Sequence, residues 1–137
     1  MGVNQSRGGR RVPVPQKSIL IVEDEGVVAK DVENRLAAQG YSVAGWAVSG
    51  EEAVAEAEAS SPDLVLMDIH LKGPVDGIEA AERIREEHDI PVVFVTAYAD
   101  DETIQRAKVA GPFGFIVKPF SERDLHTTIE IALYKHE

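Results

Sequence analysis

The sequence has no cysteine, few aromatic residues and no long apolar run. Without cysteine, the chain can form neither a disulfide nor a thiolate metal site. No stretch approaches the ~20 consecutive apolar residues that a membrane-spanning helix needs. The N-terminus is basic, but no apolar segment follows it, so we expect no signal peptide and no membrane association. These absences together predict a cytoplasmic protein.

The composition is that of one globular domain with an acidic body. A chain of 137 residues with 44% hydrophobic residues is long enough to bury a core. Before residue 18 there are four basic residues and no acid, which leaves ten basic against 24 acidic residues and a net charge of −14 for the rest. Because such a body repels phosphate backbones, we predict no direct binding to nucleic acid.

Residues 1–17 differ from the remainder of the chain. They are rich in glycine, proline and basic residues and show no apolar period; the basic residues are Arg7, Arg10, Arg11 and Lys17. We expect a flexible basic N-terminal extension here, followed by one folded domain over residues 18–137.

From Ser18 onward, short runs rich in Val and Ile alternate with segments of helical period. The predicted strands are Ser18–Val22, Tyr41–Val48, Leu64–Met67, Val92–Val95 and Phe113–Val117. The predicted helices end at Gly40, before Pro62, before Pro91, at Gly111 and near the C-terminus; Ser49 with Glu52, Asp100 or Asp101, and Ser121 with Asp124 mark three helix starts. This alternation predicts an α/β fold, a parallel sheet covered on both faces.

The informative polar residues follow the predicted strands. Glu23, Asp24 and Glu25 follow the first strand, Asp68 the third, Thr96 the fourth and Lys118 the fifth. Binding sites in open parallel sheets lie beyond the carboxyl ends of the strands, so we expect these residues to meet. Clustered carboxylates repel one another, and a hard divalent cation with oxygen ligands removes that conflict. The pattern therefore favours Mg²⁺-assisted phosphoryl chemistry with a carboxylate nucleophile.

Four segments carry a family resemblance. IVEDE, VLMDIHL, FVTAYA and FIVKPF, in this order, resemble the signature segments of CheY-like response regulator receiver domains, and the similarity runs from Ser18 to about Tyr134. The resemblance implies a doubly wound (βα)5, flavodoxin-like, three-layer sandwich with sheet order 2-1-3-4-5. It also implies a two-component phosphorelay function in which a sensor histidine kinase is the phosphodonor.

The resemblance assigns a role to each residue at the strand ends. Asp68 would accept the phosphoryl group. Glu23, Asp24, Asp68 and the backbone carbonyl of His70 would bind Mg²⁺ or another divalent cation such as Mn²⁺. Thr96 would be the switch hydroxyl, Lys118 the phosphate-binding lysine and Phe115 the switch aromatic. The Lys118–Pro119 peptide bond is cis in similar proteins, against a base rate of about 5–6% for X–Pro bonds.

The implied function is signalling rather than turnover of a substrate. Phosphorylation would reshape the surface formed by the fourth predicted helix, the fifth strand and the fifth helix, and the domain would assist its own phosphorylation and dephosphorylation. Its partner would be a downstream protein or an attached output module, and the same surface would offer a homodimer contact. Both a single-domain regulator and a receiver from a longer protein fit the sequence.

Two features depart from the family pattern. Lys72 stands four residues after Asp68, where the family usually has proline, and Asp76–Gly77 is displaced by one residue. The acidic pair is Glu-Asp rather than Asp-Asp. These differences concern the loop after Asp68 and the reach of Glu23 to the metal, but not the nucleophile. Tyr98, two residues past Thr96, is a further candidate for gating water access to the acyl phosphate.

Three alternatives belong to other functional classes. A haloacid-dehalogenase-type phosphatase needs Asp-x-Asp after the first strand, whereas Asp24 is followed by Glu25 and Gly26. A flavodoxin-type flavin site needs a loop that binds the flavin phosphate after the first strand. The three carboxylates at this place would repel that phosphate. A pseudo-receiver that serves only as an interaction module remains the third alternative.

Overall fold

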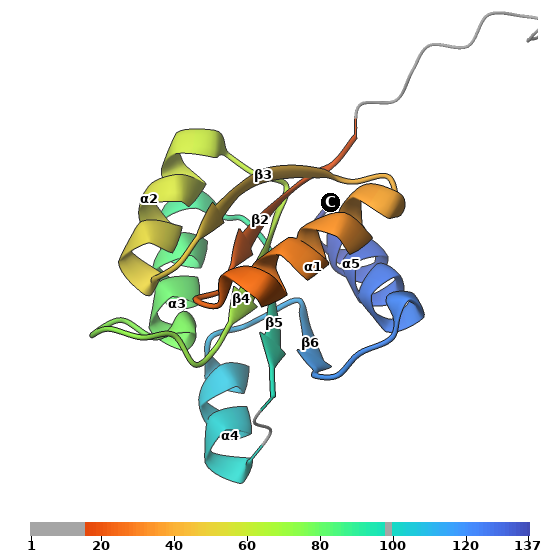
Figure 1. Cartoon of the computed structure of the whole chain (residues 1–137). Coiled ribbons are helices and arrows are strands. Elements are labelled where there is room, and N and C mark those ends of the chain that lie inside the picture. Colours follow the sequence, from red (N-terminus) through yellow and green to blue (C-terminus); the bar gives the residue numbers. More distant parts are fainter. Residues whose placement is uncertain (1–15, 98–99) are drawn as a thin grey trace, which may run out of the picture.

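The chain folds into alternating strands and helices (Figure 1). The computed structural model describes residues 16–97 and 100–137. The strands, with the numbers of Figure 1, are β2 (Ser18–Val22), β3 (Ser42–Ala47), β4 (Leu64–Asp68), β5 (Val92–Thr96) and β6 (Gly114–Val117). The helices are α1 (Gly26–Ala38), α2 (Gly50–Ser60), α3 (Gly77–His88), α4 (Asp101–Val109) and α5 (Glu122–His136). All the predicted strands are present, and each boundary lies within one residue of its prediction.

The five strands form one parallel sheet in the order β3-β2-β4-β5-β6. This order is 2-1-3-4-5 in chain sequence, so the expected doubly wound, flavodoxin-like fold is confirmed. The central strands β4 and β5 are buried at every residue, which explains their uninterrupted apolar sequence.

Side chains of the strands alternate between two buried clusters. Leu20, Met67 and Phe94 belong to the cluster that also contains residues of α2, α3 and α4. Ile21 and Leu66 belong to the other cluster, with residues of α1 and α5. Figure 1 shows α1 and α5 on one face of the sheet and α2 and α3 on the other. The alternation of successive side chains therefore produces the three layers.

The helix starts explain where each loop stops. Ser49 caps α2 by accepting a hydrogen bond from the backbone N–H of Glu52. The Glu52 carboxylate accepts from the N–H of Val48 at 2.7 Å, one residue before the N-cap, so the predicted capping box is only half formed. Asp100 rather than Asp101 caps α4. Ser121 and Asp124 form a complete capping box at α5.

Two sequence predictions concern residues that the structure does not describe. Tyr98 lies outside the described residues, and so do residues 1–15 of the predicted N-terminal extension. Among the described helices, none combines the length and apolarity needed to cross a bilayer.

Candidate functional site

Three carboxylates converge at the carboxyl edge of the sheet. Glu23 and Asp24 directly follow β2, and Asp68 is the last residue of the neighbouring strand β4. One oxygen from each lies within 4.8 Å of the others. Glu23 and Asp68 are only 5% and 8% exposed, so water screens little of their mutual repulsion. Such an arrangement demands a compensating positive charge.

Lys118, which follows the edge strand β6, supplies part of that positive charge. The backbone N–H of Lys118 donates to the carbonyl of Thr96 at 2.9 Å. Its ammonium nitrogen lies 2.9 Å from Oε1 of Glu23 and 3.8 Å from Oδ2 of Asp68. Burial opposes the charge on Lys118, but the hydrogen bond to Glu23 and the charge of Asp68 outweigh it and raise the lysine pKa. The Lys118–Pro119 peptide bond after it is cis.

Asp68 is the electrostatically frustrated member of the group. Burial, followed by repulsion from Glu23, raises its pKa to about 7, although Lys118 and the N–H of His70 both favour the ionised form. Near neutral pH the protonated and ionised forms of this carboxyl group are therefore both populated, and a nearby cation would favour the ionised form. A perturbed carboxylate in a cleft is a candidate for chemistry.

The loop after β4 folds back over the acidic cluster. The N–H of His70 donates to Oδ1 of Asp68 at 3.2 Å, and the N–H of Lys72 donates to Oδ2 of Asp24 at 3.3 Å. Gly77 returns so close to the strand that a Cβ there would lie 2.0 Å from the carbonyl oxygen of Asp68. The displacement of Asp76–Gly77 by one residue did not allow the shape of this loop to be predicted from the sequence. In the structure, the close contact of Gly77 with the backbone of Asp68 constrains that shape.

Asp76 belongs to the site, although its role was not assigned from the sequence. It lines the cleft and caps α3 by accepting from the N–H of Glu79 at 2.9 Å. Its second oxygen accepts from Arg106 of α4 at 2.8 Å. Burial opposes the negative charge, but these hydrogen bonds together lower the Asp76 pKa. The ion pair connects the rim of the cleft to α4.

Thr96 and Phe115 occupy positions next to the cleft rather than in its wall. Thr96 ends β5 and is completely buried, while the following residue, Ala97, lines the cleft. Phe115 is half-buried on β6, and its ring stands edge-to-face against Phe94, with centroids 6.4 Å apart. The structure therefore brings Glu23, Asp24, Asp68, His70 and Lys118 to one cleft, with the two predicted switch residues on the adjoining strands.

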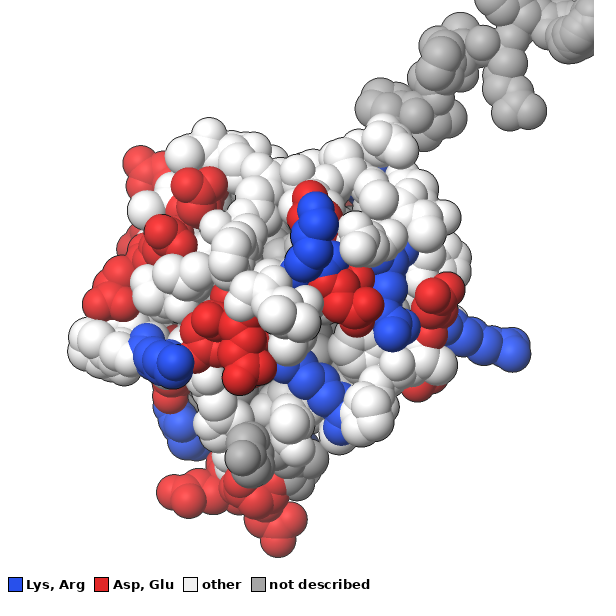
Figure 2. Space-filling model, in the orientation of Figure 1, with Lys and Arg blue, Asp and Glu red and all other residues white. Residues whose placement is uncertain are grey.

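The cleft is open to solvent and measures about 500 Å³. Figure 2 shows acidic and basic side chains meeting near the centre of the view, below the start of α1. The residues that line it are Glu23, Asp24, Glu25, Asp68, His70, Leu71, Lys72, Asp76, Ala97 and Lys118.

The chemistry of the donor set fits a hard divalent cation. The described lining residues carry five carboxylates and two ammonium groups, so the cleft has excess negative charge. Oxygen donors without thiol groups suit Mg²⁺ or Mn²⁺. The raised pKa of Asp68 has the same origin, since a proton on this carboxylate would neutralise charge that a cation would otherwise neutralise.

Trp46 is a neighbour of the site that the motifs did not indicate. It lies on the edge strand β3, and its indole N–H donates to the backbone carbonyl of Glu23 at 2.6 Å. Its place in the sequence, in the second predicted strand, gave no signal beyond its being the single tryptophan.

Comparison with known proteins identifies the family. The family described as "Response regulator receiver domain" matches residues 19–130. The transcriptional regulatory protein PdtaR of Mycobacterium tuberculosis is 41% identical over 120 residues, which cover 88% of this chain and 58% of PdtaR. The chemotaxis protein CheY of Treponema pallidum is 37% identical over 132 residues, which cover 90% of this chain and 91% of CheY.

Solved structures agree with the sequence relatives. The signal receiver domain of a modulated diguanylate cyclase from Desulfovibrio desulfuricans superposes with a TM-score of 0.84 at 41% identity, covering 89% of this chain and 97% of that one. A CheY-like receiver domain from Methanospirillum hungatei superposes with a TM-score of 0.82 at 30% identity, with the same coverages. The matched region of this chain spans little more than half of the length of PdtaR.

Proposed function

This chain belongs to the response regulator receiver domain family, and on that premise we propose that Asp68 accepts a phosphoryl group in a divalent-cation-dependent reaction. Receiver domains are signalling domains of two-component systems rather than ordinary enzymes. The observation that carries the proposal is the position of Asp68, a buried carboxylate that shares a cleft with Glu23, Asp24 and Lys118. The sequence, the cleft and the family all point to the same residue.

The proposed reaction is a phosphoryl transfer from nitrogen to oxygen. An oxygen of Asp68 attacks the phosphorus of a phosphohistidine on the partner kinase, the P–N bond breaks, and the released imidazole takes up a proton. Such reactions depend mainly on positioning and on neutralising charge on the transferred oxygens. The backbone N–H of His70 holds one oxygen of Asp68, which leaves the other directed toward Lys118.

Glu23, Asp24, Asp68 and the His70 carbonyl would hold Mg²⁺, which when bound supplies positive charge beside the phosphoryl oxygens. Lys118 is the second positive group. It now bonds to Glu23, and in the phosphorylated state we propose that its ammonium group contacts the phosphoryl oxygens. Hydrogen bonds between charged groups contribute about 1.5–3 kcal/mol each, enough to favour a different arrangement of the site.

The switch would pass through Thr96 and Phe115. We propose that the Thr96 hydroxyl bonds to the phosphoryl group and that Phe115, half-buried beside Phe94, turns into the space that Thr96 leaves. The surface formed by α4, β6 and α5 then changes. Shifting this equilibrium from 1:99 to 99:1 requires about 5.5 kcal/mol, which two or three charge-assisted hydrogen bonds supply.

Response regulators take their phosphoryl group from histidine kinases and act on downstream partners. For this chain we propose a sensor histidine kinase as donor and a downstream protein or attached output module as target. We also propose that the receiver domain spans residues 18–137 behind a basic N-terminal extension, and that it assists its own phosphorylation and dephosphorylation. We propose a cytoplasmic location and a homodimer contact on the α4–β6–α5 surface. We propose no direct contact with nucleic acid or membrane.

Intact-protein mass spectrometry after incubation with acetyl phosphate and Mg²⁺ tests this function. We expect a mass gain of one phosphoryl group that disappears when EDTA is added. A protein that binds Mg²⁺ but gains no mass from acetyl phosphate or from phosphorylated histidine kinases would be a pseudo-receiver. An equal gain in EDTA would contradict the role of the acidic cluster.

A further inference from the structure

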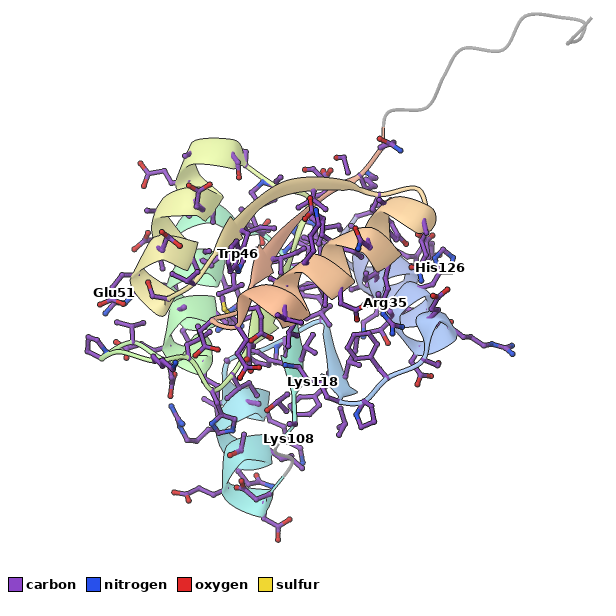
Figure 3. All side chains as sticks on the ribbon, in the orientation of Figure 1. Arg35, Trp46, Glu51, Lys108, Lys118 and His126 are labelled. Atoms are coloured by element: carbon purple, nitrogen blue, oxygen red, sulfur yellow. The ribbon has the colours of Figure 1, made fainter. Side chains whose placement is uncertain are left out.

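The indole of Trp46 is bonded to the backbone of the acidic pair. Its Nε1–H donates to the carbonyl oxygen of Glu23 at 2.6 Å, while the N–H of Glu23 donates to the carbonyl of Ala47 at 3.0 Å. The main chain of Glu23 is therefore held on both sides by strand β3. Figure 3 shows Trp46 on this strand and Lys118 after β6, which are the two edge strands of the sheet.

The position of this hydrogen bond matters more than its strength. The carbonyl of Glu23 belongs to the peptide unit that joins Glu23 to Asp24, and a peptide unit is planar. Fixing its oxygen therefore fixes the orientation of the whole plane between the two acidic residues. Rotation of that plane would turn the Asp24 side chain away from Asp68, to which it now comes within 4.8 Å.

Packing alone does not account for Trp46. The residue is 47% exposed, unlike the apolar core residues of the neighbouring strands. Its ring lies over the start of α1, where a Cβ on Gly26 would meet the ring at 3.4 Å, and it borders a groove of about 350 Å³ between β3 and α1. A partly exposed indole whose polar atom is directed at a site carbonyl is better explained by that bond.

We propose that Trp46 is a positioning residue for metal binding: its indole N–H orients the Glu23–Asp24 peptide so that both carboxylates face the cation. The inference rests on the proposed function of the cleft and adds to it a residue on β3, outside the four motif segments. Trp46 does not touch the metal or the phosphoryl group; it acts through the backbone.

Isothermal titration of the full chain with Mg²⁺ tests the proposal in three variants. Trp46→Phe keeps an aromatic ring over Gly26 but has no donor. Replacement of Trp46 by benzothienylalanine changes the N–H to sulfur and preserves the shape. Tyr134→Phe, on the 78% exposed Tyr134 of α5, is the matched control. We expect both Trp46 variants to bind Mg²⁺ about three- to tenfold more weakly, the loss of one net hydrogen bond, and the control to be unchanged.

The NMR signal of the single indole N–H provides a second readout. It should shift during the Mg²⁺ titration of the wild-type chain with the same Kd as the calorimetry. Unchanged Mg²⁺ affinity in the benzothienylalanine variant, or an indole signal indifferent to Mg²⁺, would overturn the inference while leaving the proposed function intact. A wild-type chain that binds no Mg²⁺ would overturn both.

Discussion

Two acidic regions of this molecule contrast with each other. On α2, Glu51, Glu52 and Glu58 are exposed. Figure 2 shows acidic side chains along the edge where Figure 1 places this helix. Figure 3 labels Glu51 there, pointing away from the protein. In the cleft, Glu23 and Asp68 are buried with Asp24 beside them.

The difference between the two regions lies in solvent. Water surrounds the α2 carboxylates and screens their repulsion. Glu51 and Glu52 in the first turn also interact favourably with the positive end of the helix dipole. In the cleft the same functional group is removed from water, so its repulsion must be met by Lys118, by a proton on Asp68 or by a cation. The Asp68 pKa is raised here because the fold buries these carboxylates together.

The largest predicted contrast is in phosphoryl transfer. Asp68→Asn removes the proposed nucleophile and should lower phosphoryl uptake from acetyl phosphate by more than about a hundredfold, whereas Glu51→Gln on α2 should leave it unchanged. Time courses on gels that retard phosphoproteins measure both variants. Substantial uptake by Asp68→Asn would mean that another carboxylate is the acceptor.

Metal affinity should separate the regions next. Asp24→Asn removes a proposed charged oxygen ligand and should weaken Mg²⁺ binding at least about tenfold. Glu58→Gln, which removes the same charge from an exposed helix position, should change affinity less than about twofold, because solvent screens it. Titration calorimetry provides both values. Equal losses in the two variants would indicate diffuse charge attraction rather than a built site.

The pH dependence of stability should reveal the proton on Asp68. Its pKa is about 7 in the folded chain, against 3.8 for an exposed aspartate, so the folded state binds this proton more tightly than the unfolded state does. This contribution to stability is fully present below about pH 4 and is lost as pH rises through about pH 7. At pH 8 in EDTA, Asp68→Asn should therefore be about 1–3 kcal/mol more stable than wild type.

Urea unfolding of both proteins from pH 4 to pH 8 measures that difference. Adding Mg²⁺ at pH 8 should stabilise the wild type, because the cation binds only the folded cleft. A gap between the two proteins that did not grow with pH would contradict the buried, frustrated state of Asp68. Glu51→Gln serves as the surface control and should follow the wild type.

The smallest effect is expected at the rim of the cleft. Arg106 is 52% exposed in its ion pair with Asp76, and Arg83 is 45% exposed in its pair with Glu79 on α3. Arg106→Met and Arg83→Met should each cost less than about 1 kcal/mol in urea unfolding, because solvent screens both pairs. A cost above about 2 kcal/mol for Arg106→Met alone would show that the rim behaves like the buried cleft.

The fold could be predicted from the sequence because strand burial leaves a direct signal. The apolar runs at Leu64–Met67 and Val92–Val95 are buried on both faces, so their composition and length indicated central strands. The caps at Ser121 and Asp100 likewise follow from local chemistry. These are properties of neighbouring residues, which a single sequence contains.

Most of the site could also be predicted, because parallel strands bring their carboxyl ends to one edge. The contacts of Asp76 with Arg106 and of Trp46 with Glu23 could not be predicted, since they join residues that lie 30 and 23 positions apart in the sequence through side chains. The predicted capping box of Ser49 and Glu52 was half wrong: Glu52 accepts from the N–H of Val48 rather than from that of Ser49, because the capping pattern fixes the residue types but not the donor that the glutamate reaches. Side-chain geometry across elements is the missing information.

The most direct test of the account is chemical trapping of the phosphorylated residue. Borohydride reduces an aspartyl phosphate to homoserine, and sequencing of the peptides by mass spectrometry then locates it. After reaction with acetyl phosphate and Mg²⁺, the account predicts homoserine at position 68 and at no other carboxylate. Homoserine at position 24, 5-hydroxynorvaline (the reduction product of a glutamyl phosphate) at a glutamate of α2, or neither product in a protein that has gained a phosphoryl mass, would contradict the assignment of Asp68 as the acceptor.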